Sequence, residues 1–386
     1  YGMIDAQTAD GLIPDIAPEY VVFEGGFRDS PEWGSAGVIL PWLLYRWYDD
    51  CETMKKAWPM MNRYAAYLKA KSENHILSHG LGDWFDLGPG RPGPAQLTPM
   101  ALTATAIYYY DVKLLAQMAA VLGKTDEQKQ LEAWSDEIKA AFNGKFFDRE
   151  NGVYATGSQT AMAMPLCTGL HDIVLNNLAD SIRANGNALT AGDIGFHYVV
   201  EALTNGGASQ LLFEMNNRDD VPGYGYQLKK GATTLTESWA ALEEVSNNHL
   251  MLGHLMEWFY QGIGGIRQAE NSTAYRDIVI SPEVVGDLTF AKTTFHSPYG
   301  KISVNWEKKD GLFILQATIP ANTRATVHLP FTGELTVNDR KPAPEGLVPG
   351  LAGTEVQAGK TICRVGSGRY EFKLYQGSSS AKPVLR

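Results

Sequence analysis

Apolar side chains recur every three or four residues over much of the stretch from residue 36 to residue 270, which is the spacing of an amphipathic helix. The stretch 101–122 shows it best, because its apolar stripe runs unbroken to a stop at Gly123. The pattern predicts helices at 38–48, 52–72, 101–122, 126–142, 170–184, 195–205, 208–217 and 248–262. Gly- and Pro-rich connections separate them, at 80–99, 151–160, 185–195 and 218–236. Many antiparallel helices with long loops at their ends favour an α/α toroid.

The pattern changes near residue 276, where short alternating or β-branched runs replace the helical spacing. These runs lie at 277–281, 288–295, 300–306, 311–319 and 325–329, with turn residues between them. Such spacing predicts an antiparallel β-sandwich that continues to about Tyr375. We therefore expect a helical catalytic domain at 1–275, a β-sandwich domain at 276–376 that serves mainly for packing, and a loose tail at 377–386.

Charge and composition exclude several classes of protein. The chain has 386 residues and a formal net charge of −10, whereas nucleic acids and anionic membranes require a basic surface. No apolar run reaches the length of a transmembrane helix. Three distant cysteines, without CxxC spacing, form neither a disulfide framework nor a zinc site. The start at Tyr1, without Met or leader, is expected of a processed or truncated product; we favour a periplasmic or extracellular location over the cytoplasm.

Two connections combine carboxylates with aromatic side chains. One reads Gly82-Asp83-Trp84-Phe85-Asp86, and the other ends in Glu237-Ser238-Trp239, with Asn247-Asn248-His249 shortly after it. Indole faces pack against the apolar face of a sugar ring, and carboxylate, amide and imidazole groups pair with its hydroxyls. A carboxylate pair also performs the acid and base steps of glycoside hydrolysis. Residue chemistry alone leaves a capping or core role open for each of them.

Taken in order, several segments resemble the catalytic region of the α-L-rhamnosidases of glycoside hydrolase family 78. They are Gly11-Leu-Ile-Pro-Asp-Ile-Ala-Pro18, Glu32-Trp-Gly-Ser-Ala36, Pro41-Trp-Leu-Leu-Tyr45, Gly82-Asp-Trp84, Gly157-Ser-Gln-Thr-Ala161, Gly231-Ala-Thr-Thr-Leu-Thr-Glu-Ser-Trp239, Asn248-His249 with Glu257-Trp258, and Ser297-Pro-Tyr-Gly-Lys-Ile-Ser-Val-Asn-Trp306 with Ile319-Pro-Ala-Asn322. Each motif is short, but their joint order is specific and covers nearly the whole chain.

The resemblance implies an (α/α)6 barrel and hydrolysis with inversion at the anomeric carbon. It makes Glu237 the general base that activates water. Trp33, Trp84 and His249 would line the rhamnose subsite, with Asp83 and Trp239 as neighbours. The expected partner is a carbohydrate substrate. No metal or cofactor is expected, because two carboxylates supply the proton transfers.

The chain departs from the family pattern in four ways. The family's general acid lies in an Arg-Asp-Glu-Arg-like motif that would fall before Tyr1. The usual Trp-Gly-Asp-Ala reads Trp-Gly-Ser35-Ala, and the usual Glu-Arg-Trp has Ser238 in place of Arg. The loop from Glu237 to His249 is also shorter than the family pattern. We expect either the C-terminal part of a longer enzyme, without its first barrel helices, or a divergent relative.

The sequence leaves three hypotheses for the function open. The first is an inverting α-L-rhamnosidase. The second is a glycan-binding relative that lacks the acid, and the third is another (α/α)6 glycosidase or lyase. Glu24, Asp29 and Asp86 are the local carboxylates that would substitute for the missing acid.

Overall fold

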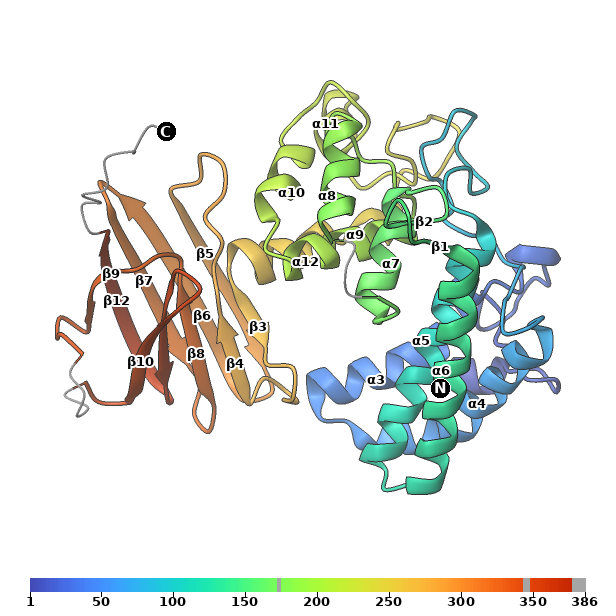
Figure 1. Ribbon diagram of the computed structural model, residues 1–386, viewed down its shortest axis with the longest axis horizontal. Coiled ribbons are helices and arrows are strands. Elements are labelled where there is room, and N and C mark those ends of the chain that lie inside the picture. Colours follow the sequence, from blue (N-terminus) through green and yellow to red (C-terminus); the bar gives the residue numbers. More distant parts are fainter. Residues whose placement is uncertain (172–174, 343–347, 377–386) are drawn as a thin grey trace. The chain divides into compact units, whose positions relative to one another are not determined.

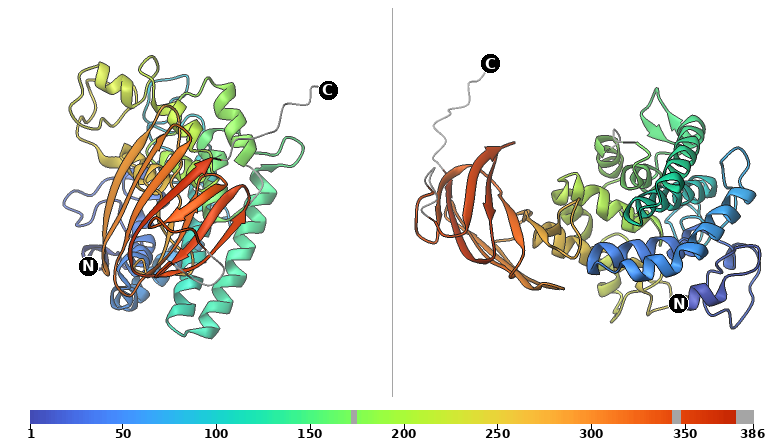
Figure 2. Two further views of the ribbon diagram at one scale, coloured as in Figure 1. Left: turned by 90° about the vertical axis from the view of Figure 1, so that its left-hand side faces the viewer. Right: turned by 90° about the horizontal axis from the view of Figure 1, so that it is seen from below.

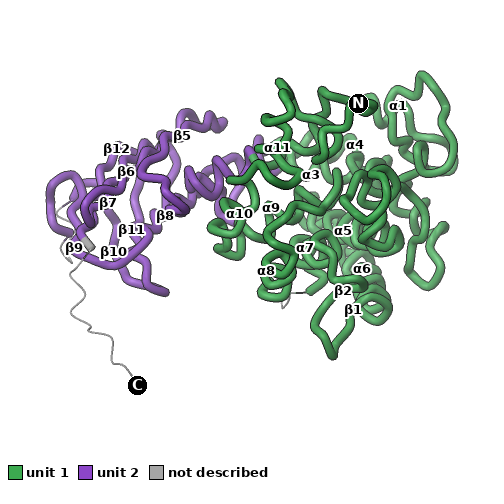
Figure 3. The backbone as a smooth tube through the Cα atoms, turned by 90° about the horizontal axis from the view of Figure 1, so that it is seen from above, with its two compact units in different colours: residues 1–45, 50–255 green, residues 46–49, 256–386 purple. Residues whose placement is uncertain are grey.

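The computed structural model describes residues 1–171, 175–342 and 348–376. The chain forms two compact units, coloured separately in Figure 3: Tyr1–Tyr45 with Asp50–Leu255, and Arg46–Asp49 with Met256–Arg386. The predicted tail at 377–386, and residues 172–174 of the helix predicted at 170–184, lie outside the described residues. The domain boundary at residue 275 stays a prediction. Among the described residues, none of the helices has both the length and the apolar character required to cross a membrane.

Helices dominate the first unit (Figure 1). In chain order the elements are α1 (Gly2–Ala6), η1 (Gly25–Phe27), α2 (Pro31–Gly34), α3 (Ala36–Tyr48), α4 (Cys51–Lys71), α5 (Met100–Val121), α6 (Thr125–Phe146), β1 (Phe147–Asp148), β2 (Val153–Tyr154), α7 (Gln159–Thr168), α8 (Leu175–Ala184), α9 (Gly195–Asn205), α10 (Ser209–Asn216), α11 (Tyr224–Lys229) and η2 (Leu250–Leu252). The end of α3, from Arg46 on, falls in the second unit. This confirms the helical character predicted for the region.

The centre of the first unit is α5, which is apolar around most of its circumference and buries residues on every face. A helix of that kind must be covered on all sides. Its neighbour α6 is amphipathic, and the indole of Trp134 donates a hydrogen bond of 2.8 Å to the hydroxyl of Tyr108 on α5. At the start of α4, Asp50 accepts from the backbone N–H of Thr53 at 2.9 Å, which satisfies a donor that the helix itself leaves free.

Two predictions about local structure were wrong. The single helix predicted at 248–262 is broken into η2, the short α12 (Leu255–Trp258) and a π-helical turn, η3 (Phe259–Ile263). His249 therefore does not begin an α-helix; it adopts an extended backbone with φ −128° and ψ 119°. The connection predicted at 218–236 contains the additional helix α11.

The second unit carries two five-stranded sheets, seen from further directions in Figure 2. One has the order β10-β11-β8-β4-β3 and the other β5-β6-β7-β12-β9. The strands are β3 (Ile266–Gln268), β4 (Asp277–Ile280), β5 (Phe290–Ser297), β6 (Gly300–Lys309), β7 (Leu312–Ile319), β8 (Arg324–Leu329), β9 (Gly333–Val337), β10 (Leu351–Gln357), β11 (Lys360–Val365) and β12 (Gly368–Gln376). The pairing is antiparallel, as predicted, except between β4 and β8, which run parallel.

Both sheets contribute to one hydrophobic core. Inward-facing residues alternate along the strands, so that Ile302 and Val304 of β6 and Phe372 of β12 meet Ile280 of β4 and Val327 of β8. All five side chains are buried. The alternation read from the sequence is therefore the alternation of a sheet with one covered face.

Candidate active site

One short segment connects most of the predicted site residues. Residues 190–195, called here the hub segment, lead into α9 and are almost entirely buried. Separate parts of the chain contact it, among them the turn at residues 83–86, Trp239 and His249. At its centre Gly192 lies so close to the turn at residues 83–86 that a Cβ there would stand 2.2 Å from the carbonyl oxygen of Trp84. Only glycine allows that approach.

Asp83 fastens the turn to the hub segment and has no exposed surface. Its Oδ2 accepts from the backbone N–H of Gly192 at 3.0 Å and from the hydroxyl of Thr160, and its Oδ1 accepts from the N–H of Gly195 at 2.8 Å. Burial raises the pKa of Asp83 to about 7, although these three donors oppose the shift. The carboxyl group is therefore enclosed, and its bonding capacity is used within the protein. The expected contact of Asp83 with sugar hydroxyls stays a prediction.

Trp239 is likewise a core residue. It is fully buried, its indole N–H donates to the carbonyl oxygen of Ala191 at 2.7 Å, and Phe196 and Tyr224 pack edge-on against it at ring-centroid distances of 4.8 and 5.1 Å. A ring enclosed on these sides offers no face to a sugar. Trp239 anchors the loop that carries Glu237. Its expected place beside the substrate stays a prediction.

Trp84 remains partly exposed and is held by its backbone. Its carbonyl oxygen accepts from the N–H of Asp193 in the hub segment at 2.7 Å, and Phe27 packs against its indole at 5.2 Å. Trp33, also partly exposed, lies on α2, which begins close by because the hydroxyl of Ser30 accepts from the N–H of Leu81 at 2.9 Å. Both indoles thus keep surface that a ligand would contact.

Glu237 is partly exposed in a loop whose two arms are bonded to each other. Its N–H donates to the carbonyl oxygen of Ser246 at 2.9 Å, and the N–H of Ser246 returns a bond of 3.1 Å to Oε2 of the carboxylate. The N–H of His249 donates to the carbonyl oxygen of Leu235 at 2.9 Å. The two arms therefore place the carboxylate and the imidazole in one region, near enough for their charges to interact.

Asp193 completes this region, although no sequence motif pointed to it. Its side chain is only 1% exposed, and its Oδ2 lies 3.4 Å from Nε2 of His249, which is 27% exposed. At that distance the contact is an ion pair rather than a well-formed hydrogen bond. The pairing with Asp193 raises the pKa of His249, whereas burial raises the pKa of Asp193 and His249 partly offsets that.

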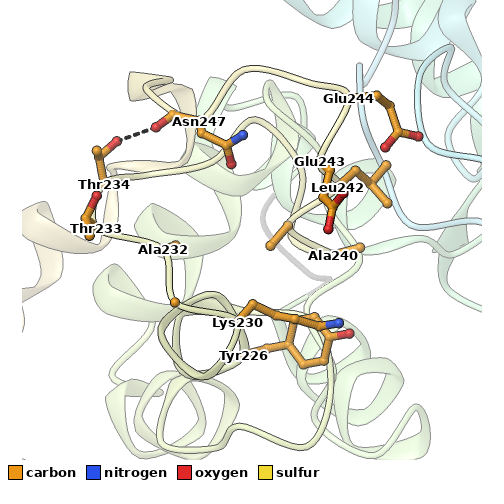
Figure 4. A pocket seen from close by; sticks show the side chains of 12 residues that line it. Tyr226, Lys230, Ala232, Thr233, Thr234, Ala240, Leu242, Glu243, Glu244 and Asn247 are labelled. Carbon is orange, nitrogen blue, oxygen red and sulfur yellow. Dashed lines mark hydrogen bonds between the residues drawn. The ribbon is translucent and has the colours of Figure 1, made fainter.

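A cavity of about 620 Å³ opens beside the Glu237 loop (Figure 4). Residues on both sides of Glu237 in the sequence line it: Gly231–Thr234 before it, and Ala240–Glu244 with Asn247 after it. Tyr226 and Lys230 close another side, with the ammonium 5.5 Å from the ring centroid. Its volume is in the range of small-ligand sites, and its lining is a nearly even mixture of polar and apolar surface.

The three local carboxylates named as substitute acids differ in their surroundings. Asp86 is buried and accepts from the N–H groups of Gln96 and Leu97, so it holds a loop together. Burial would raise the pKa of Asp29, but bonds from His79, Lys71 and Tyr67 lower it well below the usual value. That leaves Asp29 as a fixed anion, which does not donate a proton. Glu24 alone is exposed.

His75 and His79, four residues apart, have the spacing of metal ligands on a helix. His79 lies 3.2 Å from Asp29, whereas His75 lies 3.7 Å from Glu137. The two imidazoles therefore contact different carboxylates.

Ser35, where the family pattern has Asp, is fully buried. Its hydroxyl donates to Oδ2 of Asp111 on α5 at 2.6 Å, and burial raises the pKa of Asp111 well above the usual value. A carboxyl group is therefore present in this part of the helical unit, contributed by a different helix.

These features define a helical domain in which the carboxylate of Glu237 and the imidazole of His249 lie around a segment that also holds Trp84, followed by a β-domain. Family models match both parts: a bacterial alpha-L-rhamnosidase 6 hairpin glycosidase domain at residues 1–263 and a bacterial alpha-L-rhamnosidase C-terminal domain at residues 265–343. The chain belongs to the bacterial α-L-rhamnosidase family.

Individual α-L-rhamnosidases are also similar to this chain in sequence and in structure. An alpha-L-rhamnosidase of Streptomyces avermitilis is 31% identical over 96% of this chain and 35% of its own length, and one from Formosa agariphila is 29% identical over 84% and 36%. The solved alpha-L-rhamnosidase from Dictyoglumus thermophilum superposes with a TM-score of 0.86 at 29% identity, covering 97% of this chain and 43% of that one. The Streptomyces avermitilis enzyme complexed with L-rhamnose gives 0.85 at 27%, covering 97% and 35%. The chain thus spans about a third of the length of its curated relatives.

Proposed function

We propose that this chain forms the part of a glycoside hydrolase that removes terminal α-L-rhamnose with inversion, and that Glu237 is the general base. The observation that carries the proposal is the meeting of Glu237 and His249 around a hub segment that also fixes Trp84. Within the same proposal the helices belong to an (α/α)6 toroid, and the β-domain serves for packing.

The surroundings of Glu237 suit a base. One carboxylate oxygen is held by the N–H of Ser246, so the group has a defined direction while the residue keeps contact with solvent. A water on the free oxygen would be activated for attack on the anomeric carbon. Trp84 and Trp33 would stack on the apolar face of the deoxysugar, and His249 would bind a hydroxyl. No metal or cofactor takes part in this proposal.

Inversion requires a second carboxyl group on the other side of the sugar, about 6.5–9.5 Å from the base. Asp86 and Asp29 are engaged elsewhere, as described above. We therefore propose that the acid is the one that the family carries in its Arg-Asp-Glu-Arg-like motif, which precedes the matched segments.

The test is Glu237→Gln in the protein that includes the segment with the proposed acid, checked by intact mass and assayed on p-nitrophenyl α-L-rhamnopyranoside. Loss of the base should lower kcat by about 100-fold or more without unfolding the protein. The matched control is Glu132→Gln, an exposed glutamate on α6, which should retain full turnover. Proton NMR at early times should show the β-anomer of rhamnose as the first product. Near-normal turnover in Glu237→Gln, or the α-anomer first, would contradict the mechanism.

A second candidate is a glycan-binding protein without turnover. The engagement of Asp29 and Asp86 favours it, since neither is left to donate a proton. Calorimetric binding of L-rhamnose by a protein that hydrolyses no rhamnoside would support this candidate over the enzyme.

A further inference from the structure

We infer that Asp193 is a positioning residue, which fixes the imidazole of His249 beside Glu237 by pairing with its Nε2. The inference rests on the proposed function, since it concerns the same site. It adds a residue that neither the sequence motifs nor the family resemblance indicated.

The first support is the geometry of the pair. The carboxylate of Asp193 is almost fully buried and stands 3.4 Å from Nε2 of His249. Nε2 is itself buried, so the exposed 27% of the histidine side chain belongs to the rest of the residue. With Nε2 turned inward, Nδ1 is the ring nitrogen that remains for a ligand.

The second support is that Asp193 has little freedom to move. Its N–H is bonded to the carbonyl oxygen of Trp84, and the N–H groups of Gly192 and Gly195 on either side are bonded to Asp83. The backbone that carries the carboxylate is therefore fixed at three neighbouring points. A side chain on so rigid a support restricts the partner that contacts it.

The third support is the electrostatic balance. A buried carboxylate without a partner is strongly unfavourable, and Oδ1 of Asp193 has no hydrogen-bond partner among the described residues. The imidazole of His249 is therefore the group that offsets the cost of burying the Asp193 carboxylate. The charged groups that face His249 are Asp193, from the segment before α9, and Glu237, from its own loop. Both raise the pKa of His249, and Asp193 contributes the larger share.

These observations assign a separate role to each of the two residues. Asp193 holds the proton on Nε2 and sets the plane of the ring, and His249 then presents Nδ1 toward the region of Glu237. The same logic governs other histidines whose working nitrogen is set by the bond that the second nitrogen makes.

The experiment is an NMR titration of His249 in the labelled protein, with the resonance assigned by its loss in His249→Gln. In the wild type the His249 pKa should exceed that of the same residue in the urea-unfolded chain. In Asp193→Asn it should fall toward the ordinary value of about 6.5. The matched control is Asp86→Asn, another buried carboxylate that accepts backbone bonds, which should leave the titration of His249 unchanged.

Kinetics supply the second readout. Asp193→Asn should lower kcat/KM on the aryl rhamnoside roughly tenfold, as His249→Gln does, and the double variant should be no worse than His249→Gln alone. An unchanged His249 pKa in Asp193→Asn, or full additivity in the double variant, would overturn the inference. If the wild type shows no turnover, the proposed function fails, and the titration still decides whether Asp193 positions His249. If Asp193→Asn does not fold, the same titration in Glu237→Gln decides it, because a His249 pKa that stays above that of the unfolded chain there is due to Asp193, and one that does not would overturn the inference.

Discussion

At the scale of single residues, Asp83 makes the stability of the helical unit depend on pH. Burial raises its pKa in the folded protein to about 7, against about 3.9 for an unfolded aspartate. Between these values the folded protein binds more protons than the unfolded chain. The contribution of Asp83 to stability is therefore fully present below about pH 4 and is lost as the pH rises to about 7.

Asp83→Asn isolates this contribution, since asparagine does not titrate. We expect the variant to lose about 1–3 kcal/mol at pH 5, because one of the three donors around residue 83 is left without an acceptor. The loss should be smaller at pH 7.5, because the wild type no longer gains stability from Asp83 there. Urea unfolding of both proteins at the two pH values measures the difference, and a pH-independent difference would refute the assignment.

Residue chemistry pointed to the candidate site but did not distinguish partly exposed side chains from enclosed ones. Glu237 and Trp84 were singled out because a carboxylate or an indole in a Gly-rich connection is unusual. Asp83 and Trp239 carry the same signal, yet they are enclosed, since burial depends on the hub segment packing over them from a distant part of the chain. Asp193 stands among glycine and apolar neighbours without any motif, so only the fold reveals its contact with His249.

At the scale of elements, we expect the loop from Leu235 to His249 to orient the carboxylate of Glu237, the proposed base. The N–H of Ser246 is the group that orients the carboxylate of Glu237. Ser246→Pro removes that donor, and Ser246→Ala keeps it. We expect roughly tenfold lower kcat/KM for the proline variant and near-normal values for the alanine variant.

Thermal unfolding should change little in either variant, because Ser246 is exposed. Circular dichroism melts beside the kinetic assay would separate a local effect from unfolding. Equal activity in the two variants would show that the backbone donor does not matter.

Elements were predicted best where the apolar spacing of a helix persists over several turns. The stretches 101–122 and 126–142 correspond closely to α5 and α6, because more than three turns of apolar spacing leave few alternatives. The stretch 248–262 is apolar, as the pattern indicates, but it does not form one helix. Gly253 ends η2, and the following residues form separate short turns. The short α11 escaped notice because six residues are too few to establish a period.

At the scale of the whole molecule, the two compact units have separate hydrophobic cores, and we expect them to unfold in separable steps. Leu115 on α5 and Leu315 on β7 are both fully buried, one in each unit. Their alanine variants form a matched pair. Each should destabilise its own unit by about 2–5 kcal/mol, because a buried leucine loses its packing and leaves a cavity.

Differential scanning calorimetry of the wild type and both variants checks this. Leu115→Ala should shift only the transition of the helical unit, and Leu315→Ala only that of the β-unit. Turnover measured below both transitions should follow the helical unit, since the proposed base and its supporting segment all lie within it. A single transition that both variants shift equally would mean that the units fold as one body, and the β-domain would then contribute to the stability of the site as well as to packing.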